Sequence, residues 1–197
     1  MAKDFVHGRV RHVLDPVVRL LARLGVRPLA LTLAGLVLSA LAGVAVLAGE
    51  RSLAGLLLLA GGLCDTMDGA VARLSQRQTK LGAFLDSTID RYSEVAVFLA
   101  LAWRYRGGPT LVAVFLAITG SLLVSYARAR AEGLREECRI GLLERPERLV
   151  LLIVALLVGW SAVVVVLWVL AALTHVTALQ RILYIARRTS GKALAES

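Results

Sequence analysis

Long apolar segments, separated by short charged turns, recur along this chain. Each is about as long as a helix that crosses a bilayer, which needs roughly 20 mostly apolar residues. Transmembrane helices are expected over residues 29–48, 53–74, 81–103 and 110–127. A short fifth span is expected from Pro146, and Gly159-Trp160-Ser161 separates it from a sixth that reaches Ala186, although one long helix over both stretches stays open. The pattern therefore predicts an all-α polytopic membrane protein with six transmembrane helices.

The composition excludes a soluble domain of this size. Hydrophobic residues make up 58% of the 197 residues and charged residues only 19%, which leaves too little polar surface to cover a globular fold. Six spans and their loops use almost the whole chain. We therefore expect residues 1–197 to form a single membrane domain.

The first 25 residues differ from the segments that follow. Apolar residues between Phe5 and Leu21 recur at near-helical spacing, and arginines lie between them. This pattern is typical of an amphipathic helix that lies on a membrane surface. We expect residues 1–25 to form such a juxtamembrane helix ahead of the first span.

The basic residues indicate how the chain is oriented. Most of the 23 Lys and Arg residues lie in the N-terminal segment, in the stretches 73–80 and 128–148, and in the tail. Because Lys and Arg accumulate on the cytoplasmic side of membrane proteins, both termini are expected to be cytoplasmic and the protein to lie in the cytoplasmic membrane. Contact with anionic lipid headgroups accounts for the net charge of +9, so nucleic acid is not expected as a partner.

Four aspartates border or enter the second and third apolar segments. Carboxylates in a membrane are costly, and they usually pair, bind ions or line a wet cavity. Asp65 and Asp68 are three residues apart and Asp86 and Asp90 are four apart, so each pair shares one helix face. A tight loop turns the two faces toward each other. Four converging carboxylates repel one another unless cations hold them, and such oxygen ligands suit Mg²⁺ or Mn²⁺, so a site for one or two metal ions is predicted.

Small and basic residues accompany these acids. Gly69 and Gly82 have no side chains, so either a ligand or a neighbouring helix can approach the backbone closely, and both interpretations stay open. Arg73 can pair with phosphate oxygens.

Together these residues form the pattern D-x2-D-G-x2-A-R-x8-G-x3-D-x3-D over positions 65–90. The pattern resembles, at all eight fixed positions, the signature of the CDP-alcohol phosphotransferase family. The resemblance implies six transmembrane helices after a surface helix, a homodimer, and a metal site that opens to the cytosol. It also implies a reaction in which an acceptor hydroxyl attacks the phosphate next to the lipid in a CDP-diacylglycerol-type compound, and CMP leaves.

The resemblance also assigns roles by position. Asp65, Asp68 and Asp86 would be metal ligands. Asp90 would be the base that takes the acceptor proton, and it would also touch a second metal ion. Metal and Arg73 would neutralise the phosphates, which phosphoryl-type transfer requires. The residues expected to contact the CDP-linked lipid are Thr32, Gly69, Arg73 and Gly82.

The first span departs from the family pattern. Many relatives open it with Pro-Asn-x-x-Thr, and this chain has Pro28-Leu29-Ala30-Leu31-Thr32. A nucleotide contact made by that asparagine is therefore in doubt, while Thr32 remains available.

Several arginines lie at the predicted cytosolic helix ends, in the stretches 125–132, 144–149 and 180–181. Two or three guanidinium groups can hold one phosphate, which favours a phosphorylated acceptor; the arginines could equally be membrane anchors or partners of nearby glutamates. The stretches resemble the phosphatidylinositol-phosphate synthases of the family and their archaeal counterparts, whose acceptor is inositol 1-phosphate. By that similarity, the residues expected to bind the acceptor phosphate are Arg128, Arg145, Arg148 and Arg181.

Two other functions compete with this interpretation. A phosphatidylglycerophosphate synthase would use glycerol 3-phosphate, but the Arg-Glu-rich stretch that those enzymes carry after the fourth span has no counterpart here. An ion or proton transporter would place acids at the membrane midplane and show inverted repeats. The acids of this chain cluster in one region of two adjacent segments instead, and a scaffold protein would leave them unexplained.

Overall fold

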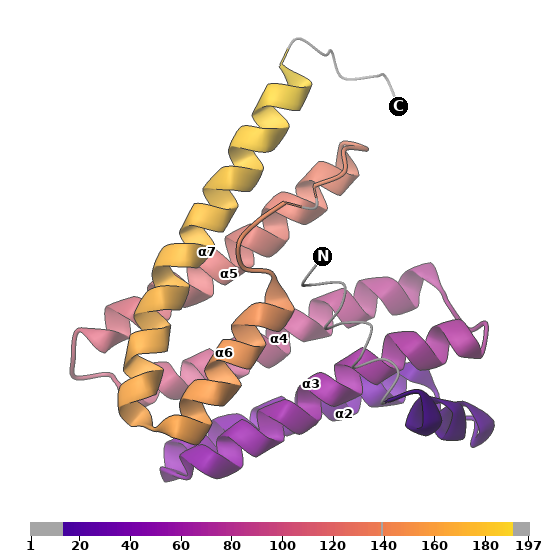
Figure 1. Ribbon diagram of the computed structural model, residues 1–197, viewed down its shortest axis with the longest axis horizontal. Helices are drawn as coiled ribbons and strands as arrows, with labels where there is room; N and C mark the ends of the chain where they lie inside the picture. Colours follow the sequence, from indigo (N-terminus) through magenta and orange to yellow (C-terminus); the bar gives the residue numbers. More distant parts are fainter. Residues whose placement is uncertain (1–13, 139, 191–197) are drawn as a thin grey trace.

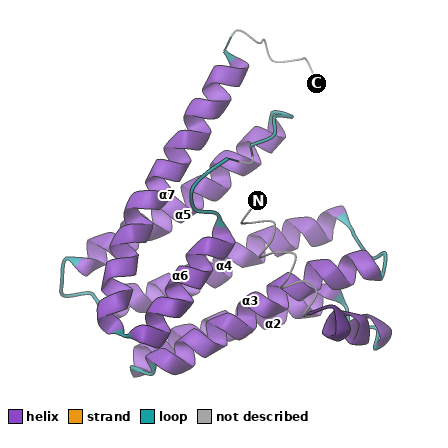
Figure 2. Cartoon of the chain, viewed as in Figure 1, coloured by secondary structure: helices purple, strands orange, loops and turns teal. Residues whose placement is uncertain are grey.

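The computed structural model describes residues 14–138 and 140–190, and every regular element in these ranges is a helix. The six long helices, joined by the short loops of Figure 2, are α2 (Pro28–Ala48), α3 (Arg51–Leu74), α4 (Lys80–Arg104), α5 (Thr110–Gly133), α6 (Arg145–Val158) and α7 (Trp160–Thr189). The predicted all-α membrane architecture is therefore confirmed at the level of its fold class.

Four of these helices, α2, α3, α5 and α7, are long and apolar enough to cross a membrane, whereas six spans were predicted. Charge explains the difference for α4, which has 25 residues but carries Asp86, Asp90, Arg91 and Glu94 within its first 15. Length explains it for α6, whose 14 residues cover about 21 Å. A bilayer core of about 30 Å is thicker than that.

The predicted boundaries agree with the structure at most turns. Gly159 separates α6 from α7, so the fifth and sixth predicted segments are two helices and not one. The fourth segment is longer than expected, because α5 continues past residue 127 to Gly133. Arg128 and Arg130 are consequently helical residues.

The predicted amphipathic surface helix is not confirmed. Residues 1–13 of the expected helix lie outside the described residues, and residues 14–23 are helical. Val18 on this short segment is buried.

The helices form two groups, which are connected by α6 and by a contact between α4 and α5 (Figure 1). Helices α2, α3 and α4 pack together, α5 packs along α7, and α6 lies against both α3 and α7. Small residues permit close contact between α2 and α3: a Cβ atom on Gly61 would lie 3.2 Å from the carbonyl oxygen of Gly35. Such packing is typical of helices in membranes, and it sets the spacing of the backbones beside the acidic residues.

Candidate functional site

A five-residue turn brings the four aspartates together. Helix α3 ends at Leu74 and α4 begins at Lys80. The Thr79 side chain caps α4 by accepting a hydrogen bond from the Gly82 N–H at 2.9 Å. The turn reverses the chain, so that the C-terminal half of α3 faces the N-terminal half of α4, as the spacing predicts.

Three of the aspartates form a compact cluster. Asp65, Asp68 and Asp86 each offer a carboxylate oxygen, and these oxygens lie within 4.8 Å of one another. Asp68 is buried, and its Oδ2 accepts a hydrogen bond from Thr32 Oγ1 at 2.6 Å. The Oδ1 atom of Asp86 is buried and accepts no hydrogen bond from the described residues. A buried, unpartnered carboxylate oxygen beside two further carboxylates fits a divalent cation that prefers oxygen ligands.

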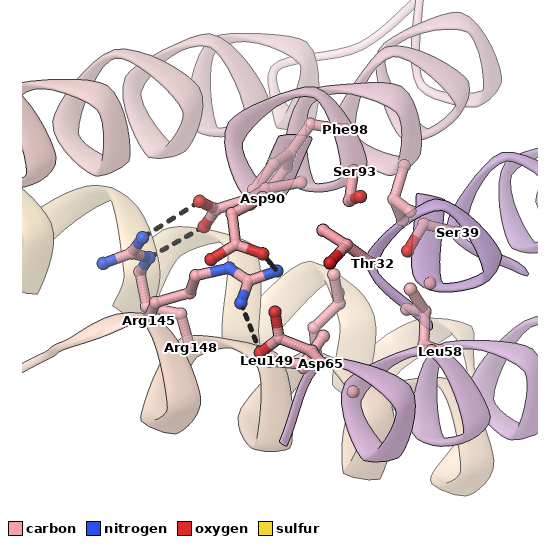
Figure 3. A pocket seen from close by; sticks show the side chains of 16 residues that line it. Thr32, Ser39, Leu58, Asp65, Asp90, Ser93, Phe98, Arg145, Arg148 and Leu149 are labelled. Carbon is pink, nitrogen blue, oxygen red and sulfur yellow. Dashed lines mark hydrogen bonds and ion pairs between the residues drawn. The ribbon is translucent and has the colours of Figure 1, made fainter. Parts of the chain in front are cut away.

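Asp90 lies beside this cluster and has a different partner. Its Oδ1 is 2.8 Å from Nη2 of Arg145, and Nη1 of the same guanidinium donates to Asp65 Oδ2 at 2.7 Å (Figure 3). Arg145 is the first residue of α6. One side chain from α6 therefore joins the acids of α3 to those of α4, which no spacing in the sequence predicts.

An interior cavity extends from Asp65 and Asp90 between α2, α3, α4 and α6 (Figure 3). Buried hydroxyl groups of Thr32, Ser39 and Ser93 line it together with apolar side chains. The site is thus polar on one side and continuous with the helix core on the other.

A second cleft gathers the residues predicted to contact the CDP-linked lipid. Thr32, Gly69, Arg73 and Gly82 all line it, next to Asp68 and Asp86 of the cluster, and its volume is about 300 Å³. Within the described residues, a Cβ atom on either glycine would meet no other helix: on Gly69 it would contact only the Arg73 guanidinium, and on Gly82 only Thr79 Oγ1. Among the described residues, neither glycine therefore serves close packing against another helix.

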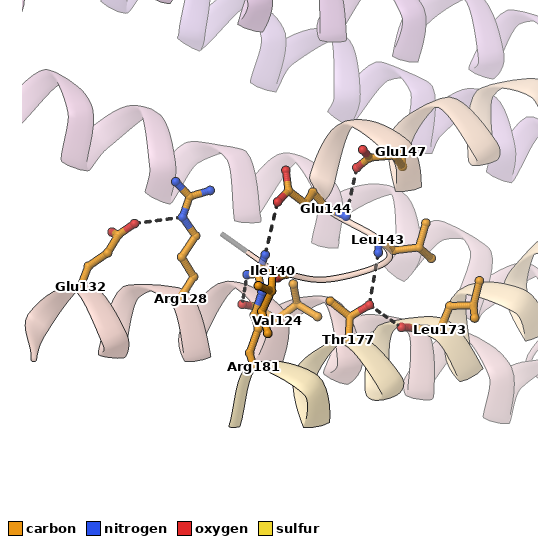
Figure 4. A network of polar contacts seen from close by, with 10 residues as sticks. All are labelled: Val124, Arg128, Glu132, Ile140, Leu143, Glu144, Glu147, Leu173, Thr177 and Arg181. Atoms are coloured by element: carbon orange, nitrogen blue, oxygen red, sulfur yellow. Dashed lines mark hydrogen bonds and ion pairs between the residues drawn. The ribbon is translucent and has the colours of Figure 1, made fainter. Parts of the chain in front are cut away.

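The four arginines predicted to hold the acceptor phosphate have four different sets of partners. Arg145 contacts Asp65 and Asp90, and Arg148, which is 2% exposed, donates to both carboxylate oxygens of Glu94 at 2.8 and 2.9 Å. Arg128 pairs with Glu132 at 2.9 Å on the surface of α5. Arg181 is buried and donates to backbone carbonyl groups (Figure 4). Of the four, Arg145 is the one that contacts the aspartates of the signature.

Glu94 is a site residue that the sequence pattern left without a role. It lies one helical turn after Asp90, so the two share a face of α4, and its partner Arg148 lies one turn after Arg145 on α6. The two ion pairs therefore lie one above the other and tie α4 to α6. Its spacing from Asp90 indicates a residue that either tunes the site or contacts a neighbouring helix, and the ion pair with Arg148 of α6 agrees with the second alternative.

Replacing Thr32 by valine is expected to weaken binding of Mn²⁺ by roughly tenfold or more, because removing a partner that orients a metal-binding carboxylate typically costs 10- to 100-fold in affinity. The Thr32 hydroxyl is the hydrogen-bond donor to Asp68 Oδ2. Calorimetric titration of the lipid-free protein with Mn²⁺ measures the effect. Thr32→Ser keeps the hydroxyl and serves as the control. If Thr32→Val and Thr32→Ser bound Mn²⁺ with equal affinity, the hydroxyl would not orient Asp68 for the metal.

Comparison with known proteins decides the family. A family model described as CDP-alcohol phosphatidyltransferase matches residues 26–180, which include the cluster, both cavities and the start of α6. The chain belongs to this family. It is therefore a metal-dependent CDP-alcohol phosphotransferase of membrane phospholipid synthesis, and a transporter is not favoured.

Relatives of this phosphotransferase are named as synthases of an inositol phosphate lipid. It is 36% identical over 187 residues to an archaetidylinositol phosphate synthase of Methanothermobacter thermautotrophicus, a match that covers 91% of each chain. It is 38% identical over 191 residues to a phosphatidylinositol phosphate synthase of Corynebacterium glutamicum. This match covers 90% of this chain and 86% of the relative.

Solved structures extend the similarity to three dimensions. The crystal structure of Mycobacterium tuberculosis phosphatidylinositol phosphate synthase with CDP-DAG bound has a TM-score of 0.84 and 30% identity, and covers 94% of this chain and all of that one. The same enzyme in complex with manganese and citrate has a TM-score of 0.81 and 31% identity, and covers 92% of each chain. The manganese in that relative and the three-aspartate cluster here support Mg²⁺ or Mn²⁺ as the cofactor of this phosphotransferase.

Proposed function

We propose that this enzyme transfers a phosphatidyl-type group from a CDP-diacylglycerol-like lipid to inositol 1-phosphate and releases CMP. The similarity to archaetidylinositol and phosphatidylinositol phosphate synthases, over about nine-tenths of the chain, is the observation that carries this proposal. A phosphatidylglycerophosphate synthase using glycerol 3-phosphate is the alternative, and none of the relatives described above bears that name.

Asp65, Asp68 and Asp86 are the residues that would hold the metal ion. When bound, a divalent cation neutralises charge on the diphosphate of the CDP-linked lipid. Thr32, Gly69, Arg73 and Gly82 would contact that lipid in the adjoining cleft, where the glycines let the phosphates approach the helix backbone. Support for this placement comes from the shared lining of the cleft by all four residues and by Asp68 and Asp86.

Asp90 would act as the base. The acceptor hydroxyl gives its proton to Asp90, the hydroxyl oxygen bonds to the phosphorus next to the lipid, and the bond from that phosphorus to the CMP oxygen breaks. Arg145 would place the acceptor, because its guanidinium already lies 2.8 Å from Asp90 and carries donors suited to phosphate. Asp90 as a further metal contact, and Arg128, Arg148 and Arg181 as acceptor ligands, remain predictions.

The enzyme is further proposed to be a homodimer with six membrane-crossing helices, in which α4 and α6 cross with the other four. Both termini and the site would face the cytoplasm, and residues 1–197 would form one domain behind a surface helix over residues 1–25. The concentration of Lys and Arg in the stretches 73–80 and 128–148, beside the site, supports this orientation.

CMP release by the purified protein tests the proposed function. CDP-diacylglycerol with inositol 1-phosphate is expected to yield CMP in the presence of Mg²⁺ or Mn²⁺, whereas glycerol 3-phosphate is not. A chelator should abolish the reaction, and added Mn²⁺ should restore it, because the phosphates then regain their counter-charge. Turnover with glycerol 3-phosphate alone would contradict the acceptor assignment but leave the family chemistry intact.

A further inference from the structure

The cleft proposed for the CDP-linked lipid has a rim formed by the ends of three helices. It extends from the aspartate cluster to Pro28 and Leu29, the first residues of α2, and to residues 77–79 in the turn between α3 and α4. These helix ends lie at one end of the bundle (Figure 1). Arg77 donates from Nη1 to the carbonyl oxygen of Gly25 at 3.4 Å, which ties the turn to the residues that precede α2.

A CDP-linked lipid that binds in this cleft has a polar end and an apolar end to accommodate. Its diphosphate belongs beside the aspartate cluster and Arg73, where a metal ion and a guanidinium supply positive charge. Its hydrocarbon chains stay among the apolar helix faces, because exposing them to water is costly. The cytidine therefore extends in the other direction, toward the rim at the helix ends.

Gln78 is the rim residue whose polar groups are available to a base. Leu29 has no polar side-chain atom, the Arg77 guanidinium is engaged with the residues before α2, and the Thr79 hydroxyl caps α4. Gln78 is exposed, and its side chain makes no hydrogen bond to any of the residues that the structure describes. Its amide is thus the uncommitted donor and acceptor on this rim.

A primary amide is complementary to the polar edge of cytosine. The amino group of the base donates a hydrogen bond, and the adjacent ring nitrogen accepts one, whereas the glutamine oxygen accepts and its nitrogen donates. Many relatives have an asparagine where this chain has Leu29. Leu29 and Gln78 line the same cleft, so the rim keeps an amide that comes from the α3–α4 turn and not from α2.

We infer that Gln78 is a substrate-binding residue: its amide bonds to the cytosine base of the CDP-linked lipid and takes the place of the asparagine that this chain lacks at position 29. This inference rests on the proposed function and refines it, since it names the side chain that contacts the nucleoside. The headgroup is then held at two points, the diphosphate at the aspartate cluster and the base at the turn.

Gln78→Ala tests this assignment by calorimetric titration in the presence of Mg²⁺. We expect the Kd for CDP to rise by about tenfold, equivalent to about 1.4 kcal/mol, because the paired hydrogen bonds to the base are lost. The Kd for ribose 5-diphosphate, which lacks the base, should stay within about twofold. An unchanged Kd for CDP, or equal weakening of both ligands, would overturn the assignment.

Gln76→Ala is the matched control. Gln76 is a second exposed glutamine of the same turn, and it does not line the cleft. This variant should bind CDP as tightly as the wild type. If it lost as much affinity as Gln78→Ala, the loss would come from the shape of the turn, and the role of the Gln78 amide would be rejected.

Adding Leu29→Asn to Gln78→Ala tests whether the two positions serve the same group. The second substitution returns an amide to the rim from α2, so the Kd for CDP should recover to within about threefold of the wild-type value. The Kd for ribose 5-diphosphate should not change. A double variant that binds CDP as weakly as Gln78→Ala would show that Gln78 does not replace an amide at position 29.

The wild-type protein in the same titrations separates this inference from the proposed function. Absence of Mg²⁺-dependent CDP binding by the wild type would overturn both, since neither survives without a site for the CDP group. Tight binding of CDP by the wild type and by Gln78→Ala alike would overturn the inference alone. The choice of acceptor does not enter, because these titrations contain none.

Discussion

Asp90→Asn is expected to lower turnover by about 100- to 10 000-fold, the usual contribution of a general base, while metal-dependent binding of a CDP compound stays measurable. Asparagine keeps the shape of the side chain but cannot take a proton from the acceptor hydroxyl. Asp90 lies outside the cluster of three carboxylates and bonds to Arg145, so its neutralisation leaves that cluster intact. CMP release measures turnover, and calorimetric titration with CDP in the presence of Mn²⁺ measures binding.

Glu50→Gln provides a control for the loss of one carboxylate. Glu50 precedes α3 at the end opposite to the site, and its side chain makes no capping hydrogen bond. Turnover in this variant should equal that of the wild type. Near-normal turnover in Asp90→Asn would remove its role as the base.

Asp68→Asn is expected to abolish both metal binding and turnover, with CMP release reduced by more than about 1000-fold, since metal ions contribute several kcal/mol to charge stabilisation in such reactions. Asp68 is the most buried member of the cluster, and it lines the cleft proposed for the CDP-linked lipid. Titration with Mn²⁺ alone, followed by the CMP assay, separates the two losses.

The pair of asparagine variants gives a stronger test than either alone. Loss of Mn²⁺ binding in Asp68→Asn but not in Asp90→Asn would match the geometry, in which the cluster and the base are distinct. Retention of wild-type Mn²⁺ affinity in Asp68→Asn is the result that rejects the cluster as the metal site. Thermal unfolding of both proteins shows whether either substitution disrupts the fold.

The spacing of the aspartates predicted most of the site because helix geometry alone determines it. Residues three and four apart share a face in any helix, and one short turn suffices to bring two such faces together. The lining of one cleft by Thr32 and Gly82 was also anticipated, through the family resemblance and not through geometry. These features depend on local structure or on a motif, and both can be read from the chain.

Partners of the long basic side chains could not be predicted in this way. Arg145 and Arg148 contact acids that precede them by more than fifty residues, and Arg181 contacts backbone carbonyl groups, which have no signature in the sequence. For a related reason, only four of the six expected spans are long and apolar enough to be recognised as spans within the described residues. Charges at the site make α4 less apolar than an ordinary span, and α6 has only 14 residues, as the short fifth segment expected between Pro146 and Gly159 implied.

The shortness of α6 has a consequence for how two dissimilar reactants meet. A helix of about 21 Å leaves roughly 9 Å of a 30 Å hydrocarbon layer uncovered, and Arg145 lies at its first residue. Because Gly159 joins the other end of α6 directly to the 30-residue α7, the shortfall lies at the Arg145 end. In the proposed reaction, a water-soluble sugar phosphate would reach Arg145 through this gap, while the diphosphate of the lipid would enter the cleft beside it, so neither reactant would have to leave its own phase.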